Sequence, residues 1–283
     1  MNSKFWVKIS VLAALSGVLL PVVAFGQAAG DSQSASGDEL VNAQVQELAK
    51  AEFLDLDDLG TGDPGILQTN PFYFMKNWRW STQRTLTFNL IKKAELELDI
   101  LNQKAAELKR SYEIDPDNAE GLAGAVENYK NSINNLRLYF DNLKDSGSDA
   151  NLDRLIDKSI DLAVKNERIF NELNLTADLS LREKIGNLQE LLGQAIALLS
   201  GKLNPVTKFG VKLEDNLSSQ KGGVLKEFVL VEVLDNFEKQ LPDNSAAKAS
   251  LLMLRDDLLF KELGKIDGAG VAPLLPGILS QLP

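Results

Sequence analysis

Between residues 91 and 143, the apolar residues recur at alternating steps of three and four positions, the spacing of one face of an α-helix. Two successive segments keep this spacing over about three to four heptads each, a length at which a coiled-coil-like packing seam against other helices is expected. The fold class is therefore predicted to be all-α. The seam residues are Ile91, Ala94, Leu98, Leu101, Ala105, Leu108 and Tyr112 in the first segment, and Leu122, Val126, Tyr129, Ile133, Leu136, Phe140 and Leu143 in the second.

Later apolar patterns predict further helices of the same bundle. The run Phe228 to Leu234 is almost continuously apolar, which suits either a buried helix or a strand. We predict a helix, because helical spacing continues beyond it to Leu241 and no partner strand is evident. The other apolar positions are Leu152, Leu155, Ile156, Ile160, Ala163, Phe170 and Leu173, then Leu181, Ile185, Leu188, Leu192, Ala195 and Leu199, and finally Ala247, Leu251, Leu254 and Leu258.

Capping and breaking residues predict where these helices begin and end. Asn70-Pro71 is an N-cap followed by proline at the first helical position, and Asn89 precedes the first long seam. Asp115-Pro116-Asp117 separates the two seams, and Ser180 with Glu183 forms a capping box. Because the segments between long helices are short, we expect consecutive helices to lie side by side in an elongated, antiparallel bundle.

The N-terminal residues predict export. Residues 1–28 combine a small basic region at Lys4 and Lys8, an apolar stretch and small residues near Ala28, which is typical of a cleaved signal peptide. The apolar stretch is at the short edge of a membrane span, so an uncleaved anchor is the alternative. We expect an acidic linker with a possible short helix at 29–62, a helical region at 63–145, more bundle helices at 146–263 and an apolar Gly/Pro-rich tail at 264–283.

The composition excludes several classes of function. The chain has no Cys and no His, so disulfides and most recognisable catalytic and metal motifs are absent from it. Its net charge of −10 disfavours binding to nucleic acid and to anionic lipid surfaces, both of which require clustered Lys and Arg. We therefore expect no nucleic-acid partner, and contact with a membrane only through the N-terminal segment if it is not cleaved.

One short segment gathers five aromatic residues, and we weigh two interpretations of it. The first is a sugar- or peptide-binding platform, because flat rings stack on sugar faces. The second is a helix that buries an aromatic face against the bundle. We favour the second and place Phe72, Met75 and Trp78 in the core, because their spacing of three puts them on one helix face, while Tyr73 and Trp80 are expected to be partly exposed. The fifth aromatic residue is Phe74.

Acidic residues occur in rows with helical spacing. Such rows either bind Ca²⁺, form the carboxylate pair of a glycosidase or lie on a solvated face beside lysines, and we favour the solvated face. A segment from Asp55 to Asp63 loosely resembles a calcium loop, but it lacks a glutamate at its twelfth position, where Ile66 stands. The rows comprise Glu95 and Asp99, then Asp153, Asp157 and Asp161, with Lys92, Lys93, Lys158 and Lys165 nearby.

The segment from about Leu59 to Leu143 resembles an uncharacterised family of exported, all-helical proteins that is common in candidate-phyla-radiation bacteria. The resemblance rests on residues 58–60, 63–67, 71–76, 87–88, 92–96 and 102–109. Gln68 stands where that family is expected to have proline, a departure that loosens the turn. The resemblance implies an exported helical domain, and it implies no catalytic residues because the family has no assigned activity.

From these features we expect a non-catalytic helical module outside the cytoplasm, on the cell surface, in the periplasm or secreted. It would bind a protein or cell-wall partner or act as a spacer. We predict no catalytic, cofactor-binding or metal-binding residues and no cofactor. The alternatives are a cell-wall glycoside hydrolase that uses only carboxylates and a low-affinity cation-binding protein. The apolar tail from Gly268 to Pro283 is expected either to lie in a groove between helices or to engage a partner.

Overall fold

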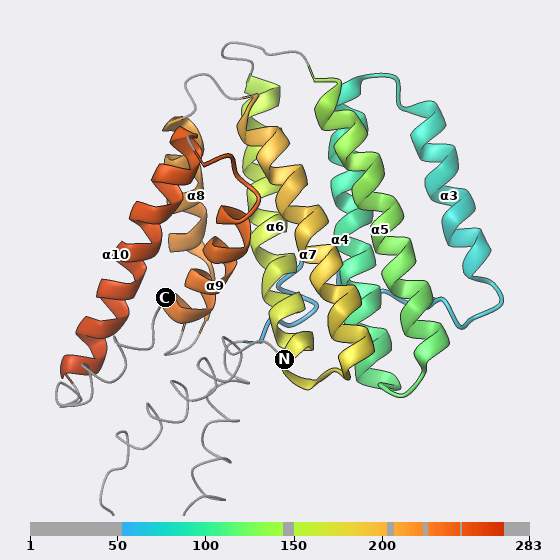
Figure 1. The fold of residues 1–283 in the computed structure, drawn as a ribbon. Helices are drawn as coiled ribbons and strands as arrows, with labels where there is room; N and C mark the ends of the chain where they lie inside the picture. The colour runs from blue at the N-terminus through green and yellow to red at the C-terminus, as the bar shows by residue number, and fades with distance from the viewer. Residues whose placement is uncertain (1–52, 144–149, 203–206, 223–225, 244, 269–283) are drawn as a thin grey trace, which may run out of the picture. The chain divides into compact units, whose positions relative to one another are not determined.

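A computed structural model describes residues 53–143, 150–202, 207–222, 226–243 and 245–268, and every regular element within them is a helix (Figure 1). This confirms the all-α prediction for the described part of the chain. The predicted leader at 1–28 and the apolar tail beyond residue 268 lie outside it. The helices are α3 (Tyr73–Leu86), α4 (Leu90–Ile114), α5 (Ala119–Asp141), α6 (Ala150–Thr176), α7 (Leu179–Ser200), α8 (Thr207–Ser219), α9 (Lys226–Glu238) and α10 (Ala246–Gly268).

The chain divides into two compact units. The unit that we call the main unit comprises Phe53–Lys221 and Val229–Asp256, and it holds α3 to α8, most of α9 and the first half of α10. The described residues of the other unit are Gly222, the first turn of α9 and the second half of α10.

Four long helices form the core of the main unit. α4 packs against α5 and α6, and α7 packs against the same two helices, so the four close into a ring in which α4 and α7 lie opposite one another. Between α5 and α6, the ring of Phe170 meets that of Tyr129 edge-on, with centroids 5.1 Å apart, and the Asn166 amide donates to the Tyr129 hydroxyl at 3.1 Å. The buried tyrosine hydroxyl therefore keeps a hydrogen-bond partner.

Ion pairs between α4 and α6 show that these neighbours run in the same direction, because the partners advance together along both helices. α5 and α6 are consecutive along the chain but are not neighbours in the ring, contrary to the expectation that consecutive helices lie side by side. The pairs are Glu95 with Arg154, Asp99 with Lys158 and Lys109 with Glu172.

The predicted apolar seams are confirmed as core positions. All seven positions of the second seam, from Leu122 to Leu143, are buried, and so are the predicted apolar positions of α6 and α7. In the first seam, the five residues between Ala94 and Leu108 are buried, while Ile91 and Tyr112 at its two ends are half-buried. The ambiguous run Phe228 to Leu234 lies within α9 and is helical, as predicted.

Three predicted helix ends differ from the structure. Asn70 does not cap α3: its side chain accepts from the backbone N–H of Phe72 in a turn, and the helix begins at Tyr73. At α7, Asp178 is the N-cap and accepts from the N–H of Leu181, so the capping box predicted at Ser180 is wrong. Asp178 stands two positions before Ser180, and its carboxylate already accepts from a backbone N–H of the first helical turn that would otherwise lack a partner. The last helix extends to Gly268, four residues beyond the start expected for the tail.

Residues 53–62, which we expected in the linker, belong to the main unit and pack against its helices. Leu54 and Leu59 are buried, and the Asn102 amide on α4 donates to the Leu59 carbonyl at 2.6 Å. Gly60 and Gly62 adopt positive φ angles, a conformation that glycine reaches without the steric cost of a side chain. The segment therefore turns tightly on its way to α3.

Among the described residues, no helix combines the length and the apolar character that a membrane span requires.

Candidate functional site

Helix α3 is attached to the bundle through two carboxylates of α4 that are fully buried. The first is Glu97, whose two oxygens accept from Nε and Nη2 of Arg84, each at 2.7 Å. A bidentate pair of this kind fixes orientation as well as distance. It holds the C-terminal half of α3 against α4.

The second buried carboxylate, Glu107, gathers four donors. It accepts from the Tyr73 hydroxyl at 2.6 Å and from the Gln68 amide at 2.9 Å, and it pairs with Lys76 at 2.6 Å and with Lys104 at 3.2 Å. Burial, reinforced by the charge of Glu107, raises the pKa of the Tyr73 hydroxyl far above its usual value. Burial also lowers the pKa of Lys104, against the opposing effect of Glu107.

These contacts decide which face of α3 points inward, and it is not the face that the spacing predicted. Tyr73 and Trp80 are buried, with 8% and 9% of their surfaces exposed. Phe72, Met75 and Trp78 share a face, as expected, but that face points outward, with Trp78 71% exposed. The prediction that Trp78 belongs to the core is wrong, because the ionic anchors turn the opposite face of the helix toward α4.

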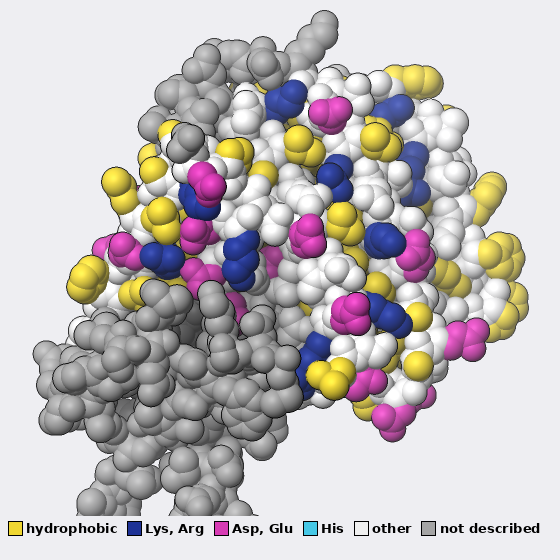
Figure 2. All heavy atoms as spheres, viewed as in Figure 1, with side chains coloured by type: hydrophobic (Ala, Val, Ile, Leu, Met, Phe, Trp, Pro, Cys, Tyr) yellow, Lys and Arg dark blue, Asp and Glu magenta, His cyan; other side chains and the backbone are white. Residues whose placement is uncertain are grey.

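The outward side of α3 therefore carries four large apolar side chains at its N-terminal end, which we call the aromatic face. Its members are 56–71% exposed. Hydrophobic side chains gather along the right-hand edge of the molecule, over α3 (Figure 2). Soluble proteins seldom expose a contiguous apolar patch without a binding role. The aromatic face consists of Phe72, Phe74, Met75 and Trp78.

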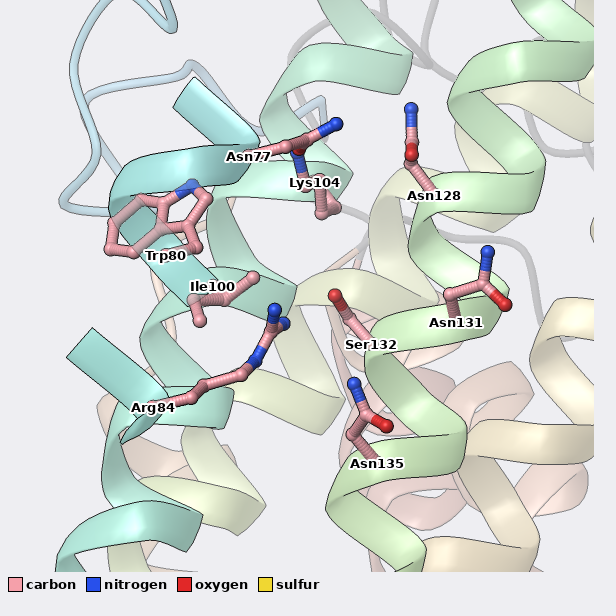
Figure 3. A pocket seen from close by; sticks show the side chains of 9 residues that line it. All are labelled: Asn77, Trp80, Arg84, Ile100, Lys104, Asn128, Asn131, Ser132 and Asn135. Carbon is pink, nitrogen blue, oxygen red and sulfur yellow. The ribbon is translucent and has the colours of Figure 1, made fainter. Parts of the chain in front are cut away.

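Behind α3 lies a polar pocket of about 160 Å³, between α3, α4 and α5 (Figure 3). Trp80 and Arg84 form one wall and Ile100 and Lys104 the floor. The opposite wall is α5, from which the Ser132 hydroxyl and the Asn135 amide project toward α3. The remaining lining residues are Asn77, Asn128 and Asn131.

A second, larger pocket of about 360 Å³ lies where the Leu59–Thr61 segment meets α4 and α6. Its charged residues are already paired, Asp99 with Lys158 at 2.7 Å and Asp161 with Lys165 at 2.8 Å. These pairs leave little free charge with which to hold a ligand.

The acidic rows found in the sequence form ties between helices. Glu95 and Asp99 pair with residues of α6, and Asp157 pairs with Lys212 of α8 at 2.6 Å. Asp161 pairs with Lys165 and also accepts from the Asn216 and Gln220 amides. Most partners therefore come from neighbouring helices rather than from the same helix. In the part of the chain that the structure describes, no three acidic side chains gather as a metal site would require.

In the segment that resembles a calcium loop, Asp58 is held by Lys221 at 2.6 Å, and this hydrogen bond lowers the pKa of Asp58. Its side chain also accepts from the Asp55 backbone N–H at 3.3 Å. These contacts bind the carboxylate to the protein itself.

Neither the two buried carboxylates nor the polar wall of the pocket was predicted from the sequence. Glu97 and Glu107 stand beside seam residues, a position that signals burial only if a further helix covers α4. Asn128, Asn131 and Asn135 carried a readable signal, because steps of three and four place their amides on one side of α5.

Comparison of the chain with protein-family models, with curated proteins and with solved structures gave no match.

Proposed function

We propose that this protein is a non-catalytic helical interaction module that works outside the cytoplasm and binds a protein partner through the aromatic face of α3. The observation that carries the proposal is the exposure of Phe72, Phe74, Met75 and Trp78 together on one short helix. Large aromatic side chains account for much of the binding energy of protein interfaces, which makes such a group a suitable contact surface.

The way α3 is attached supports this role. The Arg84–Glu97 pair and the donors around Glu107 fix the helix from its inner side. The side chains on its outer side are therefore not needed to hold the helix in place. A partner would therefore meet an already ordered surface and lose less conformational entropy on binding. The acidic charge of the chain favours a protein or a neutral cell-wall polymer over nucleic acid.

The extracytoplasmic setting rests on the sequence. Residues 1–28 fit an export signal, and the acidic stretch after it suits a tether that holds an elongated bundle, with successive helices running up and down, away from the cell surface. The resemblance to the exported helical family of candidate-phyla-radiation bacteria supports the same setting. We propose membership of that family on the residues between Leu59 and Leu143.

Site-specific crosslinking in the native host tests the function. A photoreactive amino acid at position 74 or 78 of the full chain is expected to trap one defined protein, identified by mass spectrometry. The same amino acid at position 138 is the matched control, because Leu138 on α5 is 61% exposed, close to the 65% of Phe74.

Binding of the purified partner completes the test. Phe74→Ser with Trp78→Ser should abolish binding, and Leu138→Ser should preserve it. Equal trapping at positions 74 and 138, or binding that survives the double substitution, contradicts the proposal. Adsorption of the protein to neutral lipid vesicles through the same residues would instead assign the aromatic face to a membrane.

A further inference from the structure

The pocket behind α3 has a property that the interaction role does not require: its uncharged polar side chains lack protein partners. Asn77, Asn128, Asn131 and Asn135 line it, and their side chains make no hydrogen bond with another described residue; Asn128 and Asn135 are half-buried, whereas Asn77 and Asn131 are exposed. Ser132, with only 3% of its surface exposed, likewise has no partner there. Buried polar groups normally find partners, so the half-buried amides of Asn128 and Asn135 beside the buried Ser132 hydroxyl indicate that a ligand supplies their hydrogen bonds.

The indole of Trp80 adds a further unpartnered donor. Its Nε1 is buried and has no acceptor within the described structure. Trp80 stands on the wall opposite Ser132 and Asn135 (Figure 3). The pocket therefore offers donors and acceptors on one side, and a flat apolar surface with a single donor on the other.

The size of the pocket limits the ligand to about one ring. A volume of 160 Å³ is close to that of the engineered apolar cavity of roughly 150 Å³ that holds one benzene molecule. This cavity differs in being lined by amides. Each amide carries both an acceptor oxygen and a donor nitrogen, and a hydroxyl group also donates and accepts, so amides suit a ligand with several hydroxyl groups.

The charges around the pocket favour a neutral ligand. Arg84 and Lys104 line it, but they are bound by Glu97 and Glu107, both with no exposed surface. Neither cation is available to a carboxylate or phosphate without breaking a buried ion pair, which is costly.

We propose that the pocket between α3, α4 and α5 binds one neutral, hydroxylated ring, of the class of a monosaccharide or a cyclitol. The amides of α5 and the Ser132 hydroxyl bind the ring hydroxyls, and Trp80 and Ile100 contact its apolar C–H face. The site uses the inner side of α3 and is independent of the aromatic face, since no residue is common to both.

The full-length protein is titrated with a panel of neutral hexoses, N-acetylhexosamines and inositol, and with glucuronate and inorganic phosphate. Ligand-observed NMR and isothermal calorimetry report binding. At least one neutral member of the panel is expected to bind saturably, and Asn128→Ala with Asn135→Ala should weaken it by at least about tenfold, because two hydrogen bonds are lost. Asn134→Ala is the matched control on the same helix, since Asn134 does not line the pocket. Ser132→Val, which removes the hydroxyl, narrows the pocket and leaves its amides in place, should also weaken binding strongly.

Circular dichroism establishes that each variant is folded. The proposal is overturned if no neutral ring binds, if glucuronate or phosphate binds more tightly than the neutral rings, or if the folded double variant and Ser132→Val bind as well as the unaltered protein.

Discussion

Two tryptophans of α3, two positions apart, have opposite surroundings. Trp78 is 71% exposed, whereas Trp80 is 9% exposed and lies between two pockets. Trp78→Ala should therefore change the free energy of unfolding by less than about 1 kcal/mol, whereas Trp80→Ala should cost about 3 kcal/mol, the lower end for a large buried side chain. Urea denaturation of the two variants tests this, and equal losses would contradict the assigned faces.

Glu167 of α6 makes stability depend on pH. Its carboxyl has no exposed surface, and Oε2 accepts from the Gln189 amide at 2.8 Å and from the Asn236 amide at 3.1 Å. Burial raises the pKa of Glu167 to about 8, and the two hydrogen bonds only partly oppose this. The described residues place no cation within ion-pairing distance of it.

The sign of the effect follows from the protons bound in each state. Below pH 4.5, the ordinary pKa of a glutamate, the folded and unfolded states both hold the proton and Glu167 has no effect. Between pH 4.5 and about 8, only the unfolded state releases it, so stability falls as pH rises and then levels off.

Glu167→Gln should remove this dependence while keeping an acceptor for both amides. We expect no gain at acid pH and a gain on the order of 2–3 kcal/mol near neutral pH, measured by urea denaturation across the pH range. Glu190→Gln, at an exposed position of α7, is the control and should show no such trend. A loss of stability near neutral pH that disappears at acid pH would mean that the ionised carboxylate is the native form.

At the scale of single helices, the anchoring of α3 is the most consequential contact. Glu97→Gln breaks a bidentate pair whose carboxylate is fully buried, and should cost about 3 kcal/mol. Glu95→Gln, two residues away, breaks a pair with an exposed arginine and should cost less than about 0.5 kcal/mol. Hydrogen exchange is expected to show that the backbone amides of α3 lose protection in the Glu97 variant and keep their protection in the Glu95 variant.

The start of α7 offers a second test. Asp178 accepts from the Leu181 N–H at 2.7 Å, whereas Ser180 lies inside the helix. Asp178→Ala should cost about 1 kcal/mol, and Ser180→Ala should be near neutral because alanine is the best helix former. Thermal unfolding of the two variants measures both effects. A larger loss of stability in the Ser180 variant than in the Asp178 variant would support the capping box instead.

Periodicity predicted the helices well and the surroundings of their polar faces poorly. The apolar seam of α4 identified one buried face, yet Glu97, Lys104 and Glu107 are buried too, because α3, α5 and α6 all pack against this helix. For α3, aromatic residues on both faces made the spacing ambiguous. Its orientation depends on the partners of Arg84 and Lys76, which lie 13 and 31 residues further along the chain, and spacing within one helix carries no information about them.

Over the whole molecule, acidic residues outnumber basic ones by ten, yet in the described part of the chain many carboxylates are paired. Asp99, Asp157 and Asp161 each contact a lysine and together link α4, α6 and α8. A cation would have to displace these lysines. Among the described residues, no three acidic side chains gather to bind the cation in compensation for the lost ion pairs.

Calcium should therefore have no specific effect on the stability of the protein. A ligand that binds only the folded state at a hundredfold excess over its Kd contributes about 2.7 kcal/mol, which raises the melting temperature of a domain of this size by several degrees. We expect a few millimolar CaCl2, compared with EDTA at the same ionic strength, to shift the melting temperature by less than about 1 °C. Sodium chloride alone should raise it slightly, because screening weakens the repulsion among the excess acidic groups. A rise of several degrees with calcium and none with sodium would restore the cation-binding hypothesis.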